Sequence, residues 1–280
     1  TAIVTVMDSG GSSGRLRREM GIPSLGDLRR CLVALAGNNS RSLTLADLIE
    51  YRFEGEGVLD GHSLGNLLLA ALIRKTGGLE TGIQKMAQLL SSRGTVLPVT
   101  LQSVALCAVL RDGTILESEA SLDQRGASKI GVERIYLRPQ AKANPQAVNA
   151  IREAQIIVLG PGDLYTSVLP NLLVQGITEA ICSSQAQKIF IGNLFTKPGE
   201  TDGYKLSDFL KEILRYLGSN QPLDLVVANA GLGGDCPVET DPEACQDLVR
   251  RILVRPVADP TDPYRHHPDR TAQAILEEVL

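Results

Sequence analysis

The segment "MDSGGSSGRLRR", residues 7–18, brings together the residue types that bind anions. Its glycines let successive backbone N–H groups converge on one anion without a Cβ in the way. Its serines add hydroxyl donors and its arginines add positive charge, although a solvated turn would have a similar composition. The candidate phosphate-binding residues here are Gly10, Gly11, Ser12, Ser13, Gly14 and Arg15.

A second segment, "VLGPGDLYTSVLPNLLV", residues 158–174, runs from a strand-like stretch through a Gly-Pro-Gly turn into a helix start. Hydroxyl groups at Tyr165, Thr166 and Ser167 could donate hydrogen bonds near that helix start. Gly-Pro-Gly is also a common way to leave a strand, so a purely structural turn is the alternative.

Two further segments carry polar candidates. In "IGNLFTKPGETDGYKLSDF", residues 191–209, Asn193 closes an apolar run and Lys197 lies on the following loop, which could also be merely solvated. In "GHSLGNLLLAA", residues 61–71, His62 and Asn66 fall four apart on one face of a helix start. A cap or surface role for His62 is the simpler interpretation.

Two acidic residues flank the first glycine-rich segment. Asp8 follows the first apolar run, and Asp27 stands at the start of the first predicted helix. Together they could hold a divalent cation that bridges phosphates. The alternative is that Asp27 is only an N-cap.

The elements that must position these residues follow from hydrophobic periodicity. Short β-branched runs predict strands at 1–7, 155–160, 188–193 and 224–229, and helical periodicity separates them. This alternation predicts a Rossmann-like, doubly wound α/β fold with a mostly parallel sheet and helices on both faces. Ligands of such sheets bind beyond the carboxyl ends of the strands. The predicted helices are 27–36, 63–76, 79–92, 145–154, 168–182, 206–217 and 270–279.

Two regions differ from this pattern. Residues 95–138 alternate around Asp112-Gly113 and predict an antiparallel β-hairpin insertion in an otherwise single domain over 1–280. Residues 234–268 are rich in Pro, Asp and Cys and show no clear pattern. The chain starts with Thr inside a strand-like run, from which we expect that an N-terminal segment precedes it.

Composition limits the function classes. The 280 residues carry a net charge of −4 and 4 % aromatic residues, which argues against binding nucleic acid or an anionic membrane. No apolar run approaches the length of a membrane span. Five scattered cysteines fit buried, reduced thiols and a cytoplasmic protein. The absence of a Walker A motif and of a GxGxxG motif disfavours ATPases and dinucleotide-dependent oxidoreductases.

Taken in order, these loops resemble the gluconeogenesis-factor (YvcK-type) branch of the CofD-like, or 2-phospho-L-lactate transferase, superfamily. The resemblance covers nearly all of residues 1–217 and returns at "YRHHPDRTAQAIL". It implies a Rossmann-like core with a further strand and a GGGTG-type turn upstream. Founding enzymes of the superfamily transfer 2-phospholactate from a guanylyl diphosphate donor with a divalent metal. The YvcK-type branch is associated with gluconeogenic growth, cell shape, peptidoglycan precursor supply and UDP-sugar binding.

The resemblance also assigns residues. It places a phosphate-side loop at 10–15, acidic positions at Asp8 and Asp27, and an Arg-His stretch that contains Arg265. The chain departs from the family pattern at Ser9, where a second acid is usual, at Asp163, where Ser is usual, and at Lys197, where Gln is common. The loss at Ser9 weakens a metal site, whereas the cation at Lys197 can offset the added acid at Asp163. The other positions that the resemblance implies are Gly160, Gly162, Leu164, Tyr165, Ser167, Asn193, Gly199, Glu200 and Asp202.

The sequence therefore favours a cytosolic regulatory protein that binds a nucleotide sugar similar to UDP-N-acetylglucosamine. Glycine turns would hold the diphosphate, Asn66 or Asn193 would recognise polar edges of the ligand, and five arginines within residues 15–30 would supply charge. The alternative is a metal-dependent transferase that acts on a nucleotide-diphosphate donor. No cofactor is required by the first hypothesis, Mg²⁺ is the candidate metal, and a homo-oligomer stays open.

Overall fold

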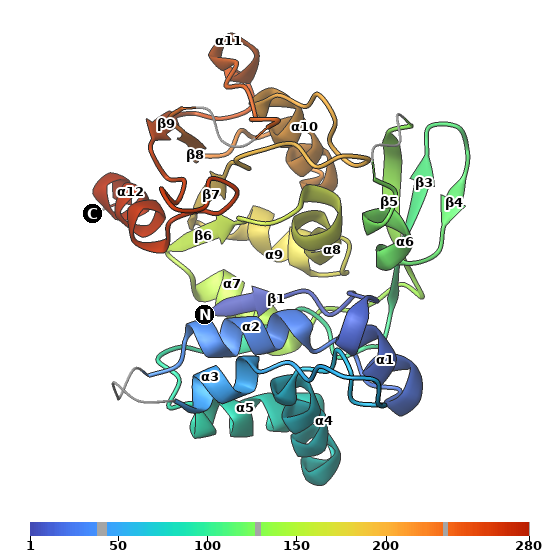
Figure 1. Cartoon of the computed structure of the whole chain (residues 1–280). Helices are drawn as coiled ribbons and strands as arrows, with labels where there is room; N and C mark the ends of the chain where they lie inside the picture. Colours follow the sequence, from blue (N-terminus) through green and yellow to red (C-terminus); the bar gives the residue numbers. More distant parts are fainter. Residues whose placement is uncertain (38–43, 127–129, 232–234, 280) are drawn as a thin grey trace.

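The computed structural model describes residues 1–37, 44–126, 130–231 and 235–279 (Figure 1). Its parallel strands form two groups. One is the pair β1 (Ala2–Val4) and β2 (Val96–Pro98), and the other has the order β6 (Ile156–Leu159), β7 (Gln187–Ile191), β8 (Leu225–Asn229), β9 (Ile252–Arg255). The prediction of a mostly parallel α/β fold is confirmed.

Helices cover both faces of the four-stranded sheet. On β7 and β8, Phe190 and Val226 belong to a core shared with α7 (Pro145–Glu153), α9 (Ile177–Ser183) and α10 (Leu206–Leu217). Their neighbours Ile189 and Val227 point the other way, into a core shared with α12 (Pro268–Val279). This alternation is the period of two that a strand covered on both faces requires.

The other parallel pair packs against helices from the first hundred residues. They are α2 (Gly26–Ala34) and α5 (Leu79–Leu89). Helix α4 (Leu64–Thr76) belongs to the same core and packs on α5, with the short α3 (Leu45–Glu50) beside α4. Ser63 caps α4 by accepting from the Asn66 N–H at 3.2 Å, as its position before an apolar run predicts.

An antiparallel sheet stands beside these layers (Figure 1). It has the order β4 (Ile115–Leu116), β3 (Ala105–Leu110), β5 (Val132–Arg138), and it carries the short helix α6 (Glu119–Asp123). The predicted hairpin at Asp112-Gly113 is present, with Gly113 at φ +84°. The predicted start of the insertion at 95 is wrong, because residues 96–98 pair in parallel with β1.

Three other expectations need correction. Residues 11–20, expected as a loop, form helix α1 (Gly11–Met20). The single helix predicted over 168–182 is instead a π-helical turn η1 (Leu164–Val168), then α8 (Leu169–Leu172) and α9, because Gly176 at φ +99° interrupts it. Asp27 is not an N-cap, since Leu25 holds that position.

The segment without a predicted pattern continues the main sheet. It contains α11 (Pro242–Cys245) and β9, and β9 extends the parallel sheet next to β8. Within the described ranges, no helix has the length and apolar character needed to cross a membrane.

Candidate functional site

The first glycine turn is the beginning of helix α1. The Gly14 N–H donates to the Gly10 carbonyl at 2.8 Å, so the N–H groups of residues 11–13 lie ahead of the first helical bond and have no acceptor within the helix. The chain folds back tightly here, because a Cβ on Gly14 would lie 1.9 Å from the Ser9 carbonyl oxygen. This helix beginning therefore offers free donors of the kind that bind anions.

A buried network of neutral groups supports that turn. The Asn66 Nδ2 donates to the hydroxyls of Ser12 at 3.2 Å and Ser13 at 3.3 Å. The Ser12 Oγ lies 3.0 Å from the His62 Nδ1. Burial lowers the pKa of His62, with further lowering by Arg15, so its ring is neutral and can accept the Ser12 proton.

The structure brings Asn66 to the glycine turn, as the sequence hypothesis requires. Its Oδ1 atom is buried and has no donor among the described residues. A buried oxygen without a donor is available to a ligand. The interpretation of His62 as a surface residue or cap is wrong, because its side chain is buried against Ser12.

The arginines divide into structural and available groups. The Arg17 Nη2 donates to the Val104 carbonyl at 2.6 Å, and the buried Arg29 pairs with Glu50 at 3.5 Å. Arg15 donates to the Asp60 carbonyl oxygen at the edge of the turn, while Arg18 is exposed. Fewer arginines therefore remain for an anion than the sequence suggests.

The second glycine turn lies at the carboxyl end of β6. Gly160 adopts φ +82°, and the Asn193 Nδ2 donates to the Gly162 carbonyl at 2.9 Å. The Asn193 Oδ1 is a second buried oxygen without a donor in the part of the chain that the structure describes. Asn193 thus joins the end of β7 to the turn that follows β6.

The side chains after this turn have different roles. Leu164 and Tyr165 are buried in the core, and the Tyr165 hydroxyl lies 2.9 Å from that of Tyr204. Burial raises the pKa of Tyr165, so this hydroxyl is neutral. Ser167 stays close to the turn, because a Cβ on Gly162 would lie 3.1 Å from the Ser167 Cβ.

Lys197 is surrounded by carboxylates. Its Nζ lies 2.8 Å from Asp163, 2.8 Å from Glu200 and 2.5 Å from Asp123. Burial alone lowers the pKa of Lys197, but these carboxylates together raise it. The two charged departures, Asp163 and Lys197, therefore compensate each other as expected, and Lys197 is not a free cation.

The loop around Lys197 is held from within. The Gly199 N–H donates to the Asp202 carboxylate at 2.6 Å, so Asp202 closes the loop. Glu200 has a side chain that is 1 % exposed, and this burial raises the pKa of Glu200 to about 7 although Lys197 lowers it.

Glu119, in the first turn of α6, brings a carboxyl group to Asp8 that the sequence patterns did not reveal. Its Oε2 accepts from the Ser9 N–H at 3.2 Å, and the Ser9 Oγ accepts from the Ala120 N–H at 2.9 Å. Burial, followed by the charges of Asp8 and Asp123, raises the pKa of Glu119 to about 7. Glu119 thus supplies a second acid beside Asp8, although Ser9 does not.

Asp27 faces the same space. Burial raises the pKa of Asp27; Arg30 at 3.4 Å lowers it, and the charges of Asp8 and Asp163 raise it further. Within the described ranges, no three or more Cys, His, Asp or Glu side chains are placed to hold a metal ion. The site therefore offers pairs of carboxylates, which suit Mg²⁺ only when phosphate or water oxygens complete its shell.

The C-terminal stretch reaches the site through a neighbour of the predicted residue. Arg265 is exposed and pairs with Asp262 at 3.1 Å. His266 Nε2 lies 3.1 Å from the carbonyl oxygen of Gly192, directly before Asn193, and burial lowers the pKa of His266. The sequence shows Arg265 and His266 side by side, but it does not indicate which of the two side chains is buried.

These features define a Rossmann-like α/β protein with a candidate anion site at the carboxyl ends of its parallel strands. The family model of 2-phospho-L-lactate transferase CofD matches residues 1–258. The chain therefore belongs to the CofD family.

Individual relatives agree with this assignment. A relative from Nostoc sp. is 42 % identical over 99 % of this chain, which spans only 62 % of that relative. The protein named gluconeogenesis factor from Halalkalibacterium halodurans is 41 % identical over 99 % of this chain and 88 % of its own length. A crystal structure of a Bacillus halodurans protein matches with TM-score 0.91 and 41 % identity, covering 98 % of this chain and 90 % of that one.

Proposed function

We propose that the protein is a cytosolic regulator that binds a nucleotide sugar similar to UDP-N-acetylglucosamine. It would act in gluconeogenic growth, cell shape and cell-wall precursor supply, in line with the relatives that are named gluconeogenesis factors. The free cysteines of the described chain fit the proposed location, although Cys182 and Cys236 are exposed rather than buried.

The observation that carries the proposal is the connection of the two glycine turns through α6. Glu119 at its start accepts from Ser9 beside the first turn, and Asp123 at its end pairs with Lys197, which holds Asp163 of the second turn. The free N–H groups of α1 would take up one phosphate and the turn around Gly162 the other.

Two buried amide oxygens without hydrogen-bond donors favour a ligand that itself donates hydrogen bonds. The Oδ1 atoms of Asn66 and Asn193 can accept from the N–H and O–H groups of a base and a sugar. An inorganic diphosphate offers no such donors when ionised, so a nucleotide sugar suits these positions better.

The charge of the site indicates how a diphosphate would be held. The charge of Asp8 contributes to the raised pKa of both Asp27 and Glu119, so these acidic groups lie close together and would repel a bare diphosphate. We propose that the carboxylates of Asp8 and Glu119 would hold Mg²⁺ when the ligand binds, and the charge of the ion would offset this repulsion.

Thermal unfolding with UDP-N-acetylglucosamine tests the proposal. The ligand should raise the melting temperature, more with Mg²⁺ than with EDTA, because it binds only the folded state. Arg15→Ala should reduce the rise, whereas Arg93→Ala, at an exposed arginine that precedes β2 and belongs to neither glycine turn, should not. The proposal fails if millimolar ligand gives no shift in either buffer.

One observation favours the second candidate, a metal-dependent transferase. Glu119 provides beside Asp8 the acid that Ser9 lacks, so the carboxylate pair needed to hold a metal is present on two different elements. A bound metal would stabilise charge that develops on the phosphate. Metal-dependent release of a nucleoside monophosphate from a diphosphate-linked donor, abolished by Glu119→Gln, would establish this reaction.

A further inference from the structure

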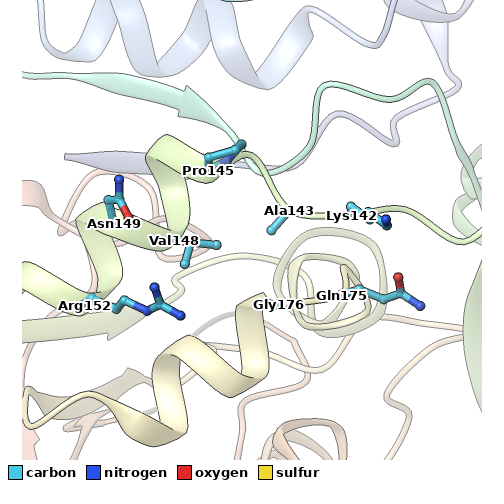
Figure 2. Close-up of a pocket in the computed structure, with 8 residues that line it drawn as sticks. All are labelled: Lys142, Ala143, Pro145, Val148, Asn149, Arg152, Gln175 and Gly176. Carbon is cyan, nitrogen blue, oxygen red and sulfur yellow. The ribbon is translucent and has the colours of Figure 1, made fainter.

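A separate groove lies where the chain enters α7 and where it approaches α9 (Figure 2). It is a shallow depression, open to solvent, with a volume of about 450 Å³. Its lining includes Lys142, Pro145, Val148, Asn149, Arg152 and Gln175.

The backbone on both sides of the groove is fixed. The Ala143 N–H donates to the Gln175 carbonyl at 2.9 Å, and the Gln175 N–H donates to the Ala141 carbonyl at 2.9 Å. Asn144 is buried and donates from Nδ2 to the Pro98 carbonyl at 3.2 Å, which anchors the start of α7 to β2. The groove is therefore formed before any ligand arrives.

The polar side chains of the groove are uncommitted. In the described part of the chain, the side chains of Lys142, Asn149, Arg152 and Gln175 form neither a hydrogen bond nor an ion pair. No carboxylate lines the groove in those ranges, although the chain as a whole carries a net charge of −4. The lining thus carries two cations and two amide groups on exposed side chains, and the Glu179 carboxylate lies at its edge, where it accepts from the Gly176 N–H at 3.0 Å.

The arrangement of these groups defines the shape of a ligand. Figure 2 shows Arg152 and Asn149 on one side of the groove and Lys142 and Gln175 on the other. The apolar side chain of Val148 lies between them. Two cations separated by apolar surface match a molecule with acidic groups at both ends of a short aliphatic stem.

We propose that this groove binds a small organic dianion, separately from the site at the strand ends. Arg152 would hold one acidic group through its planar guanidinium, and Lys142 would hold the other as a point charge. The amides of Asn149 and Gln175 would donate further hydrogen bonds.

Titration of the protein with glutarate and with 3-phosphoglycerate tests this proposal, with NMR detection of the Asn149 and Gln175 side-chain amides. One of the two should bind saturably, and the comparison distinguishes a dicarboxylate from a phosphate-bearing acid. Butyrate, which has one acidic group, should bind about tenfold more weakly, as the loss of one charged contact implies.

The double variant Lys142→Gln/Arg152→Gln should weaken binding at least about tenfold. Its matched control is Lys75→Gln/Arg93→Gln, which removes the same two charges at exposed positions outside the groove and should leave the affinity unchanged. Absence of saturable binding by both probes, or an equal loss in the control, would overturn the proposal. Binding of the UDP-sugar should be the same in all these variants, so the two sites are tested independently.

Discussion

The two glycine turns of the site have similar sequences but different physical surroundings. The turn at 10–14 is the beginning of a helix, and its serines bond to the neutral groups of His62 and Asn66, although the Asp8 carboxylate accepts from the Gly10 N–H at 2.7 Å. The turn at 160–162 is surrounded by charges, because Asp163 pairs with Lys197 and Lys197 pairs with the buried Glu200. A glycine-rich loop therefore does not by itself say how its ligand site is built.

The difference leads to different sensitivities. In the first turn, the backbone at Ser9 passes too close to Gly14 to leave room for a Cβ. A larger side chain at Gly14 should therefore destabilise this turn more than the loss of a charge would. The second depends on charge balance in a partly buried place, so removal of one charge should damage it most.

Gly14→Ala should have the largest effect. The new Cβ would overlap the Ser9 carbonyl oxygen, and we expect the free energy of unfolding to fall by about 3 kcal/mol or more, measured by urea denaturation. Gly11→Ala is the control, because a Cβ there meets nothing within 4 Å and only the φ of +47° is unfavourable, at about 1 kcal/mol. Equal losses in the two variants would contradict the role of close approach.

Lys197→Met should have the next largest effect, about 3 kcal/mol, because it leaves the buried Glu200 without its partner. Adding Glu200→Gln should recover part of the loss, which a double-mutant cycle would measure as coupling. Lys205→Met removes an ion pair whose two side chains are exposed and should leave the stability unchanged. If Lys197→Met behaved like Lys205→Met, the charge balance of the second turn would not be needed.

Asn66→Ala should cost about 1–2 kcal/mol of stability, since two hydroxyls lose a buried donor. It should also weaken UDP-sugar binding, because the Oδ1 atom disappears. Asn220→Ala, an exposed change of the same kind, is the control for both measurements. If Asn66→Ala changed neither the stability nor the binding, Asn66 would not be part of the binding site.

The smallest expected effect is a dependence of the melting temperature on pH that is caused by Glu119. Because folding raises the pKa of Glu119 to about 7, the protonated form stabilises the fold at low pH, and this stabilisation is lost as the pH rises through 7. The melting temperature should fall by a few degrees, roughly 2–5 °C, between about pH 5 and 8, and Glu119→Gln should make the slope shallower. A slope identical in the variant would show that Glu119 does not titrate there.

Local patterns predicted much of the fold for a physical reason. In α10, the residues Leu206, Phe209 and Leu210 repeat at helical spacing and are all buried, so one periodic face identified the helix. The β-branched runs of β6 to β8 predicted buried parallel strands in the same way.

The failures came from contacts between distant parts of the chain. The composition of "GSSGRLRREM" disfavours a helix, and α1 forms there with Ser12 and Ser13 bonded to Asn66, more than fifty residues away. Glu119 reaches Ser9 across 110 residues, and no local pattern indicates that contact. The resemblance selected Leu164 and Tyr165 as binding-site positions, but the burial of their side chains assigns them to packing.

In the proposed complex, both glycine turns hold one ligand. NMR titration of the protein with UDP-N-acetylglucosamine and Mg²⁺ tests it through the backbone amides of residues 11–13 and of residues 162–164. We expect both sets of amides to shift with the same dissociation constant. Shifts confined to one turn, or separate dissociation constants for the two, would contradict it.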